Sequence, residues 1–262
     1  MSDLIYVDEC DFSKERSQLF DIQGGVAQRN FAKRHVEASL VSEKEEVYSY
    51  ISKFIEERPY INSIAFSDGA TLYQLELFNW VRKTYPDKDI NQPLQRSRTG
   101  HYAVYGENPP GPTNFPFEEW KERTDKWQEN CRRSLTADLL IISANAITMK
   151  GEVVSIDGLG NRVSGMLFGP KHVICIVGRN KIYPDSDTAL TMIHHRVVPL
   201  TYLRHINKHH ASFQDVPCVK LGQCVNCMHE YSSCRDVVVM RGQIKQHKDR
   251  FHLLMVNQDL GF

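Results

Sequence analysis

Two short and strongly apolar segments, residues 137–143 and 172–178, constrain the fold of this 262-residue chain more than any other feature. Apolar runs of this length are typical of strands that are buried on both faces near the centre of a parallel sheet. A third strand is predicted at 61–66, where a turn of small residues and then a helix over 72–84 complete half of a βαβ unit. We therefore predict an α/β fold with a parallel-rich sheet, helices on both faces and these three strands side by side.

Other segments with a clear pattern extend this prediction. Ser42 and Glu45 have the spacing of a capping box, which predicts a helix that ends at Arg58-Pro59. Further helices are expected over 117–134, which is highly charged, over 161–168, and over 185–210, where the helical stretch breaks at Pro199. Further strands are expected as a hairpin of 146–148 with 152–156 and as the segments 237–240 and 251–256.

Two segments depart from this alternation of strands and helices. Residues 1–40 show no clear period, so we interpret them as an N-terminal arm with a turn at Gly24-Gly25. Residues 86–116 contain six prolines and are predicted to be a long loop inserted in the domain. The expected division is thus an arm over 1–40 and an α/β domain over 41–262, with a C-terminal cysteine loop over 217–235.

Charge and hydropathy exclude several classes of function. Lys and Arg number 32, as do Asp and Glu, so the formal net charge is zero, which argues against nucleic acid or a membrane surface as a partner. No run approaches the roughly 20 apolar residues of a membrane helix. The first residues are acidic and lack the apolar stretch of a signal peptide, so we expect a cytoplasmic protein.

Four of the seven cysteines lie within 17 residues near the C-terminus, and this spacing predicts a metal site. Four thiolates in one loop, two of them in a C-x2-C pair, can surround zinc or an iron–sulfur cluster. An iron–sulfur cluster is the cofactor that we favour, with structural zinc and ordinary loop cysteines as alternatives. The predicted ligands are Cys218, Cys224, Cys227 and Cys234, and the cysteines expected to stay outside the site are Cys10, Cys131 and Cys175.

The histidines give a weaker metal signal. On an unbroken helix His194, His205 and His209 would share one face, and two histidines four residues apart can bind zinc. Pro199 interrupts the helix, however, and no glutamate lies between the histidines in the H-E-x-x-H manner. The pattern therefore favours ordinary helix residues.

Polar residues that follow predicted strands or begin a helix form a candidate site for an anion. Ligands of open α/β sheets bind at the carboxyl ends of the strands, and a turn before a helix can direct N–H groups at an anion. Arg162 is suited to clamp a carboxylate or phosphate. Lys181 and Asp157 are the catalytic candidates, against the alternatives of a solvated charge and a tightly packed glycine turn. The predicted substrate-binding residues are Thr71, Asn145, Asn161, Arg162 and Lys181.

The second half of the chain also carries motifs in an order that resembles a known family. They are Asn145-Ala146-Ile147-Thr148, Asp157-Gly158, Gly160-Asn161-Arg162, Phe168-Gly169-Pro170-Lys171, Val177-Gly178-Arg179-Asn180-Lys181, then Arg196, Pro199 and Arg204, the cysteine loop, and Leu260-Gly261-Phe262. Over about residues 136–262 this order resembles the short members of the lactate-utilisation (LUD) domain family, with a weaker match at 61–72.

The resemblance implies a fold similar to the sugar-phosphate isomerase and CoA-transferase superfamily. It also implies a link to the oxidation of lactate or other organic acids, often beside iron–sulfur proteins, without naming the reaction. The chain departs from the family's first turn, where Gly69 replaces a serine and Gln74 replaces a glutamate. A glutamine cannot act as a base, so any chemistry of that carboxylate is not expected here.

These observations favour an iron–sulfur-binding enzyme or redox subunit that acts on a small carboxylate- or phosphate-bearing metabolite, with other redox proteins as further partners. Two alternatives stay open. The first alternative is a non-catalytic regulatory or binding subunit in which a metal holds the cysteine loop together. The second is a zinc-containing transferase or isomerase on the same scaffold. The sequence does not identify the substrate or the direction of the reaction.

Overall fold

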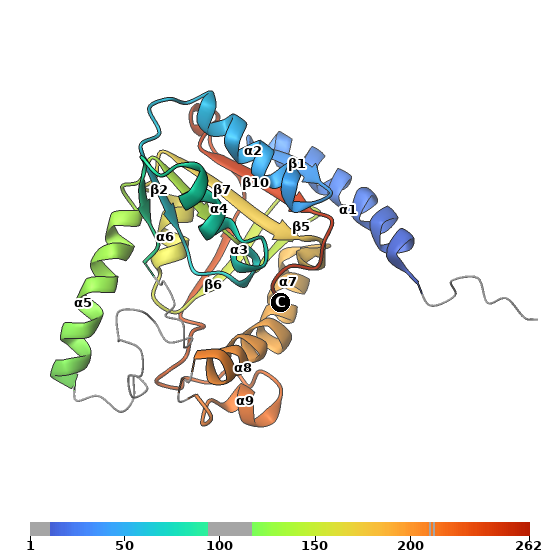
Figure 1. The fold of residues 1–262 in the computed structure, drawn as a ribbon. Coiled ribbons are helices and arrows are strands. Elements are labelled where there is room, and N and C mark those ends of the chain that lie inside the picture. Colours follow the sequence, from blue (N-terminus) through green and yellow to red (C-terminus); the bar gives the residue numbers. More distant parts are fainter. Residues whose placement is uncertain (1–10, 94–116, 210, 212) are drawn as a thin grey trace, which may run out of the picture.

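The computed structural model describes residues 11–93, 117–209, 211 and 213–262, and its main feature is a sheet of six parallel strands (Figure 1). Their order across the sheet is β1 (Glu37–Val41), β10 (Phe251–Val256), β7 (His172–Gly178), β4 (Leu139–Ile142), β2 (Ser63–Phe66) and β3 (Asp89–Asn91). Every neighbouring pair is parallel. The three strands that were expected to lie side by side are β2, β4 and β7, and this prediction is confirmed.

Helices cover both faces of the main sheet, as the sequence predicted. One face packs against α2 (Lys44–Glu56), α3 (Ala70–Gln74) and α4 (Leu77–Thr84). The other packs against α1 (Ser13–Lys33), α6 (Asn161–Leu167) and a second sheet. The side chains of β7 alternate between these layers, which makes all seven of its residues buried. The class is therefore α/β.

The second sheet has four strands in the order β8 (Ile182–Tyr183), β5 (Ala146–Thr148), β6 (Val153–Asp157) and β9 (Asp236–Met240). The antiparallel pair of β5 with β6 confirms the predicted hairpin. The outer face packs against α7 (Ser186–Met192), a π-helical turn (Ile193–Val197), α8 (Val198–His209) and α9 (Pro217–Leu221).

Pro199 does not end the helical stretch. The π turn directly before it closes with a bond from the N–H of Val198 to the carbonyl of Ile193, and α8 continues through the proline. Proline lacks the N–H that an α-helical bond would need, and a wider turn is a common way to accommodate this loss.

Residues 13–41, which were interpreted as part of an arm, form α1 and the edge strand β1 of the main sheet. The predicted turn at Gly24-Gly25 is wrong, because both glycines lie inside α1. A Cβ on Gly24 would come within 2.8 Å of the Leu40 side chain, so glycine lets the helix approach the strand closely. The buried residues of α1 do have helical spacing, but two of the four are small, which hid the pattern from the sequence analysis.

Three element boundaries also differ from the prediction. The helix expected from Ser42 begins at Lys44, and the backbone N–H of Ser42 donates to Glu46 in place of Glu45. The helix expected over 72–84 is divided into α3 and α4, because Glu76 adopts a left-handed conformation with φ of 53°. The predicted loop over 86–116 begins with the short strand β3, and residues 94–116 lie outside the described part of the chain.

The remaining predicted elements are confirmed. Helix α5 (Phe117–Ser134) contacts β2, β3 and α6, while β9 and β10 match the two C-terminal strands to within one residue. Within the described residues, no helix is both long enough and apolar enough to span a membrane.

Candidate functional site

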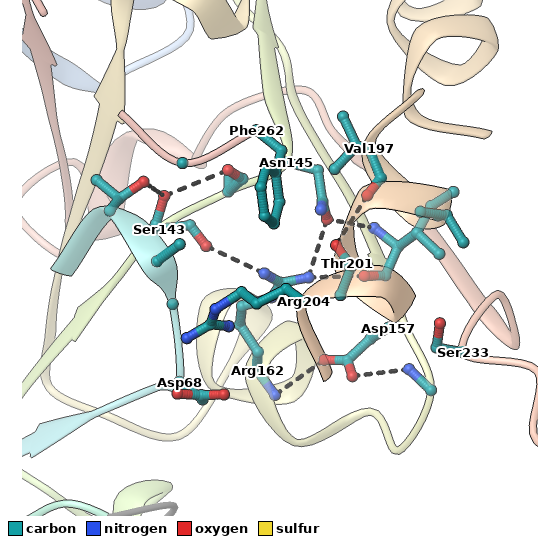
Figure 2. Close-up of a pocket in the computed structure, with 18 of the residues that line it drawn as sticks. Asp68, Ser143, Asn145, Asp157, Arg162, Val197, Thr201, Arg204, Ser233 and Phe262 are labelled. Carbon is teal, nitrogen blue, oxygen red and sulfur yellow. Dashed lines mark hydrogen bonds between the residues drawn. The ribbon is translucent and has the colours of Figure 1, made fainter. Parts of the chain in front are cut away.

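A cavity of about 230 Å³ lies beyond the carboxyl ends of β2, β4 and β7, next to the second sheet (Figure 2). This is the edge at which open parallel sheets bind ligands. All six residues that the sequence analysis proposed for substrate binding or catalysis line it, although they come from segments up to 110 residues apart: Thr71, Asn145, Asp157, Asn161, Arg162 and Lys181. The predicted convergence of these residues is therefore present in the structure.

Lys181 occupies the floor of the cavity and is only 6% exposed. Its ammonium group donates to the hydroxyls of Thr71 at 3.0 Å and Ser143 at 3.3 Å, and to the carbonyl of Ala144 at 3.2 Å. Burial, together with the positive charge of Arg162, lowers the pKa of Lys181 to about 8. The lysine is thus not the solvated charge that was one alternative from the sequence.

Arg162 forms the wall beside Lys181. Its guanidinium donates to the Asn145 side chain at 2.9 Å, to the carbonyl of Ile156 at 2.6 Å and to the carbonyl of Ser143 at 3.5 Å. Its Nε is buried and, within the described residues, has no hydrogen-bond partner. The Asn145 amide oxygen also accepts from the N–H of Ile156, so this asparagine fixes Arg162 to the hairpin of β5 and β6.

Asp157 caps the N-terminus of α6 with its carboxylate. Its two oxygens accept from four backbone N–H groups, those of Gly158, Leu159, Arg162 and Val163, at 2.8 to 3.3 Å. Because both oxygens are already engaged by backbone donors, including the N–H of Arg162, the geometry suits a positioning role for Arg162 more than a catalytic one.

The Gly178-Arg179-Asn180-Lys181 motif divides its side chains between two tasks. Arg179 binds Asp259 and Asn257, and Asn180 accepts from the N–H of Leu260, so these two residues hold the C-terminal segment. Lys181 instead turns into the cavity. The lysine clamp proposed from this motif therefore depends on its neighbours for its position.

Gln74, which replaces the family's glutamate, lies outside the residues that line the cavity. Its side-chain oxygen accepts from the N–H of Gly261 at 2.6 Å. Gly261 has φ of +71°, and a Cβ there would lie 2.8 Å from the Lys181 amine. Gln74 thus holds the segment that covers Lys181, a task that needs an acceptor oxygen and no base.

Sequence reasoning missed several residues of the cavity. Ser143 directly follows the buried run of β4, and Asp68 follows β2, so a rule that includes each polar residue after a strand would have found both. Thr201, Arg204 and His205 lie on α8. The sequence analysis noted Arg204 only among the family motifs and His205 only as a weak metal signal, and no local pattern placed any of the three at this cavity. Figure 2 shows the Arg204 guanidinium close to Arg162, while the Phe262 ring points into the cavity from above. Three basic side chains, Lys181, Arg162 and Arg204, therefore share this space.

The cysteine loop borders the same cavity. Ser233, next to Cys234, is a lining residue, and its N–H donates to the Tyr202 hydroxyl on α8 at 2.7 Å. The N–H of Arg235 donates to the carbonyl of Asp157 at 3.1 Å. The loop is therefore attached to both walls of the cavity.

The four clustered thiols interact with one another. Burial first and then the charges of Cys224, Cys218 and Cys227 raise the pKa of Cys234 to about 11, and burial with Cys227 and Cys224 raises that of Cys218. Such mutual repulsion is what a bound cation relieves, because metal ligation favours the thiolate. The N–H of Asn226 also donates to the sulfur of Cys224 at 3.4 Å, and hydrogen bonds of this kind support metal-bound sulfur.

This donor set fits a zinc ion or an iron–sulfur cluster in its chemistry. Among the described residues, however, no three His, Cys, Asp or Glu side chains are already arranged to hold a metal ion. The shared metal centre thus stays a prediction. Cys175 is fully buried in β7 and Cys131 lies on α5, where Asn161 donates to its sulfur at 3.7 Å, while Cys10 is outside the described residues. Of the histidines, His205 lines the cavity and His194 Nδ1 lies 3.9 Å from the sulfur of Cys224.

Comparison with known proteins places the chain in a family. The model of the LUD domain matches residues 26–251. A crystal structure of a DUF162 family protein from Deinococcus radiodurans aligns with 94% of this chain and 96% of its own, at 11% sequence identity and a TM-score of 0.40. No curated protein matches the sequence. Because the family model spans most of the chain, including α6, the Lys181 motif and the cysteine loop, the protein belongs to the LUD domain family.

Proposed function

We propose that this protein is an iron–sulfur-binding enzyme or redox subunit that acts on a small metabolite bearing a carboxylate or phosphate. Membership of the LUD domain family relates the protein to lactate utilisation. The observation that carries the finer proposal is the charge of the cavity, in which three basic side chains meet two carboxylates, Asp68 and Asp157.

The charge balance of the cavity favours an anionic ligand. The carboxylate of Asp157 is already engaged by four backbone N–H groups, which leaves less of its charge for the basic residues. Arg162 keeps a buried N–H that has no partner in the described part of the chain, and an unpaired buried donor costs about 1 to 3 kcal/mol. A carboxylate or phosphate oxygen would accept from this N–H and restore the lost hydrogen bond.

The position of the cysteine loop supports a metal near this ligand. Ser233 joins the cavity wall directly to Cys234, so a group held by Cys218, Cys224, Cys227 and Cys234 would lie beside the cavity. When bound there, an iron–sulfur cluster supplies electron transfer or an open iron that acts as a Lewis acid. Other redox proteins are the partners that exchange electrons with such a subunit.

The side chains of the chain have separate roles in this proposal. Arg162 and Arg204 bind and orient the anionic group. Lys181 neutralises charge and holds a proton at its Nζ, which the hydroxyls of Thr71 and Ser143 can exchange with the ligand. The segment at Gly261 and Phe262 covers the amine and limits the access of water.

The test is anaerobic purification followed by analysis of iron, sulfide and zinc, with isothermal titration of lactate, pyruvate and inorganic phosphate. We expect iron and sulfide in the wild type and loss of both on Cys→Ser substitution at any of the four clustered positions. The matched controls Cys131→Ser and Cys175→Ser keep their metal. Full metal content after removal of two clustered cysteines, or no binding of any of the three anions, contradicts the proposal.

A zinc-containing transferase or isomerase is the second candidate. The observation that favours it is the Lys181 amine between two hydroxyls, since proton transfer at that amine needs no electron carrier. Bound zinc without iron or sulfide, together with anion binding, would select it. Zinc without anion binding would instead select a subunit in which the metal only stabilises the cysteine loop.

A further inference from the structure

Lys181 differs from the other lysines that the structure describes in having a buried amine whose recorded partners are all neutral. Its three donors point to two hydroxyls and one carbonyl, and among the described residues no ion pair to a carboxylate is formed. Lys171, in contrast, is exposed and lies 2.7 Å from Asp138. A buried ammonium without a counter-ion is costly, so a protein that only needed a positive charge would be expected to provide one.

The surroundings of Lys181 activate an amine as a nucleophile. Desolvation and a nearby cation are the two means by which proteins make a lysine reactive toward carbonyl groups. Both act here, since the side chain is 6% exposed and the Arg162 guanidinium lies in the same cavity. They lower the pKa of Lys181 to about 8, so that about one tenth of the amine is neutral at pH 7, against less than about one thousandth for an ordinary lysine.

We propose that Lys181 forms a Schiff base with the carbonyl carbon of a small ketone or aldehyde that carries a carboxylate or phosphate. This inference rests on the proposed function, because the same cavity must bind the anionic group. Arg162 and Arg204 would hold that group, so that the carbonyl carbon of the bound ligand faces Lys181. The closeness of Gly261 to the amine restricts the ligand to small compounds.

Groups of the cavity can carry the proton transfers that Schiff-base formation requires. The neutral amine attacks the carbonyl carbon, forming a C–N bond, and a proton passes to the carbonyl oxygen to give a carbinolamine. The hydroxyls of Thr71 and Ser143, which are 3.2 Å apart, are placed to relay that proton. The remaining N–H proton of the former amine then passes to the hydroxyl group, which leaves as water, and the C=N bond forms without any change in oxidation state.

The experiment is reductive trapping on the holoprotein as purified. The protein is incubated at pH 7 with sodium cyanoborohydride and one of three probes: pyruvate, glyceraldehyde 3-phosphate or acetone. Intact-mass measurement gives the number of adducts, and peptide mapping locates them. We expect one adduct per chain on Lys181 with pyruvate or with the phosphorylated aldehyde, which tells the two anionic groups apart, and little reaction with uncharged acetone.

Two variants control the result. Lys181→Arg keeps the charge but has no amine of low pKa, and is expected to lose the adduct. Lys150→Arg, at an exposed lysine on a turn, is expected to keep it. In the wild type, modification of Lys181 should exceed that of Lys150 by at least about tenfold, because its neutral fraction is larger by about two orders of magnitude.

The inference is overturned if adducts are spread over exposed lysines without an excess on Lys181. It is also overturned if pyruvate and phosphate bind in titrations but neither carbonyl probe is trapped, in which case the proposed anion site survives. Absence of anion binding would remove the proposed function and this inference together. Because the wild-type peptide map is decisive alone, poor folding of Lys181→Arg does not affect the test.

Discussion

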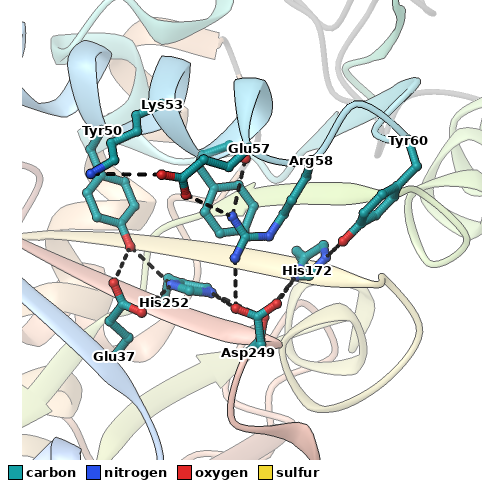
Figure 3. Close-up of polar contacts among 10 residues, drawn as sticks. Glu37, Tyr50, Lys53, Glu57, Arg58, Tyr60, His172, Asp249 and His252 are labelled. Atoms are coloured by element: carbon teal, nitrogen blue, oxygen red, sulfur yellow. Dashed lines mark hydrogen bonds and ion pairs between the residues drawn. The ribbon is translucent and has the colours of Figure 1, made fainter.

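The two ends of the main sheet both bury basic side chains, but they treat them differently. At the amino end, His172 and His252 lie on either side of Asp249 (Figure 3), and both contact its backbone carbonyl. Both imidazole rings lie edge-on to the Phe54 ring. All four ring nitrogens have hydrogen-bond partners. At the carboxyl end, Lys181 is buried without a carboxylate partner in the described chain, and Arg162 keeps a buried N–H unpaired.

The hydrogen bonds at the amino end assign His172 to its neutral form. The hydroxyl of Tyr60 donates to Nε2 of His172 at 2.7 Å, whereas the hydroxyl of Tyr50 donates to the Glu37 carboxylate at 3.4 Å and lies 3.0 Å from Nδ1 of His252. The other nitrogen of each ring donates to the Asp249 carbonyl, at 2.8 and 3.1 Å. Burial lowers the pKa of both imidazoles. These tautomers follow from the bonding network.

We infer that the amino end of the sheet serves stability and that the carboxyl end is suited to binding. A fully bonded buried cluster stabilises a unique packing and has nothing left to offer a ligand. A buried ammonium and an unpaired N–H cost stability, and such costs persist where function needs them. Substitutions at each end of the sheet test this inference.

The largest effect is expected for Arg162→Ala at the carboxyl end. Loss of the guanidinium should weaken phosphate or pyruvate binding by about 30-fold or more, since removal of one partner of a buried charge pair costs about 2 to 5 kcal/mol. Stability should fall too, by about 1 to 3 kcal/mol, because the carbonyls of Ser143 and Ile156 lose a donor. Titration and urea unfolding measure both effects, with the exposed Arg132→Ala as control; unchanged affinity would contradict the assignment.

At the amino end, His172→Ala should lower the free energy of unfolding by about 2 to 4 kcal/mol while changing anion affinity less than about twofold. The substitution removes two hydrogen bonds and leaves a cavity against Phe54. Tyr60→Phe removes one donor and should cost about 1 kcal/mol. Urea unfolding and titration of the same preparations provide the measurement. A stable His172→Ala variant with weakened anion binding would reverse the roles assigned to the two ends.

Lys181→Met is expected to change the free energy of unfolding in the opposite direction. Replacing a buried ammonium by a methionine of similar length should raise the free energy of unfolding by about 1 to 3 kcal/mol at pH 7 and weaken anion binding. The folded pKa of about 8 lies below the unfolded value of about 10.4, so the unfolded chain binds more protons between them. Wild-type stability should therefore rise from pH 8 to pH 10, and the variant should lack this rise. A destabilised variant would mean that the three hydrogen bonds outweigh the cost of burial.

The smallest expected effect is a loss of stability at acidic pH. Because the folded pKa values of His172 and His252 lie below the unfolded value of about 6.5, the unfolded chain binds protons more readily, and stability is lost as pH falls below about 6.5. The melting temperature at pH 7.5, 6.5 and 5.5 measures this loss. It should persist in Lys181→Met and diminish in His172→Ala. If His172→Ala loses as much stability on acidification as the wild type, the loss originates in other groups, for example exposed carboxylates.

Local pattern was sufficient to predict the central strands and the position of the cavity. The apolar runs of β4 and β7 identify buried strands at the centre of the sheet, since few other structures bury so short a run completely. Residues that follow such strands must meet at one edge of a parallel sheet, which is why Thr71 and Lys181 were found from positions 110 residues apart. Helix α1 was not predicted because two of its buried positions are the small residues Gly24 and Ala27. These residues pack closely but do not show the helical spacing of large apolar side chains in the sequence.

The class of fold, the edge of the sheet at which the cavity lies and the cluster of cysteines were predictable from the sequence, because each follows from short-range pattern. The contacts that each group makes depend on the tertiary structure. Arg179 and Lys181 are two residues apart and carry the same charge, yet one holds the C-terminal segment and the other turns into the cavity. The direction of each side chain depends on Asp259 and Thr71, which are distant in sequence and meet it only after the sheet has formed. The lowered pKa of Lys181 likewise comes from burial and from Arg162, and no local pattern encodes either.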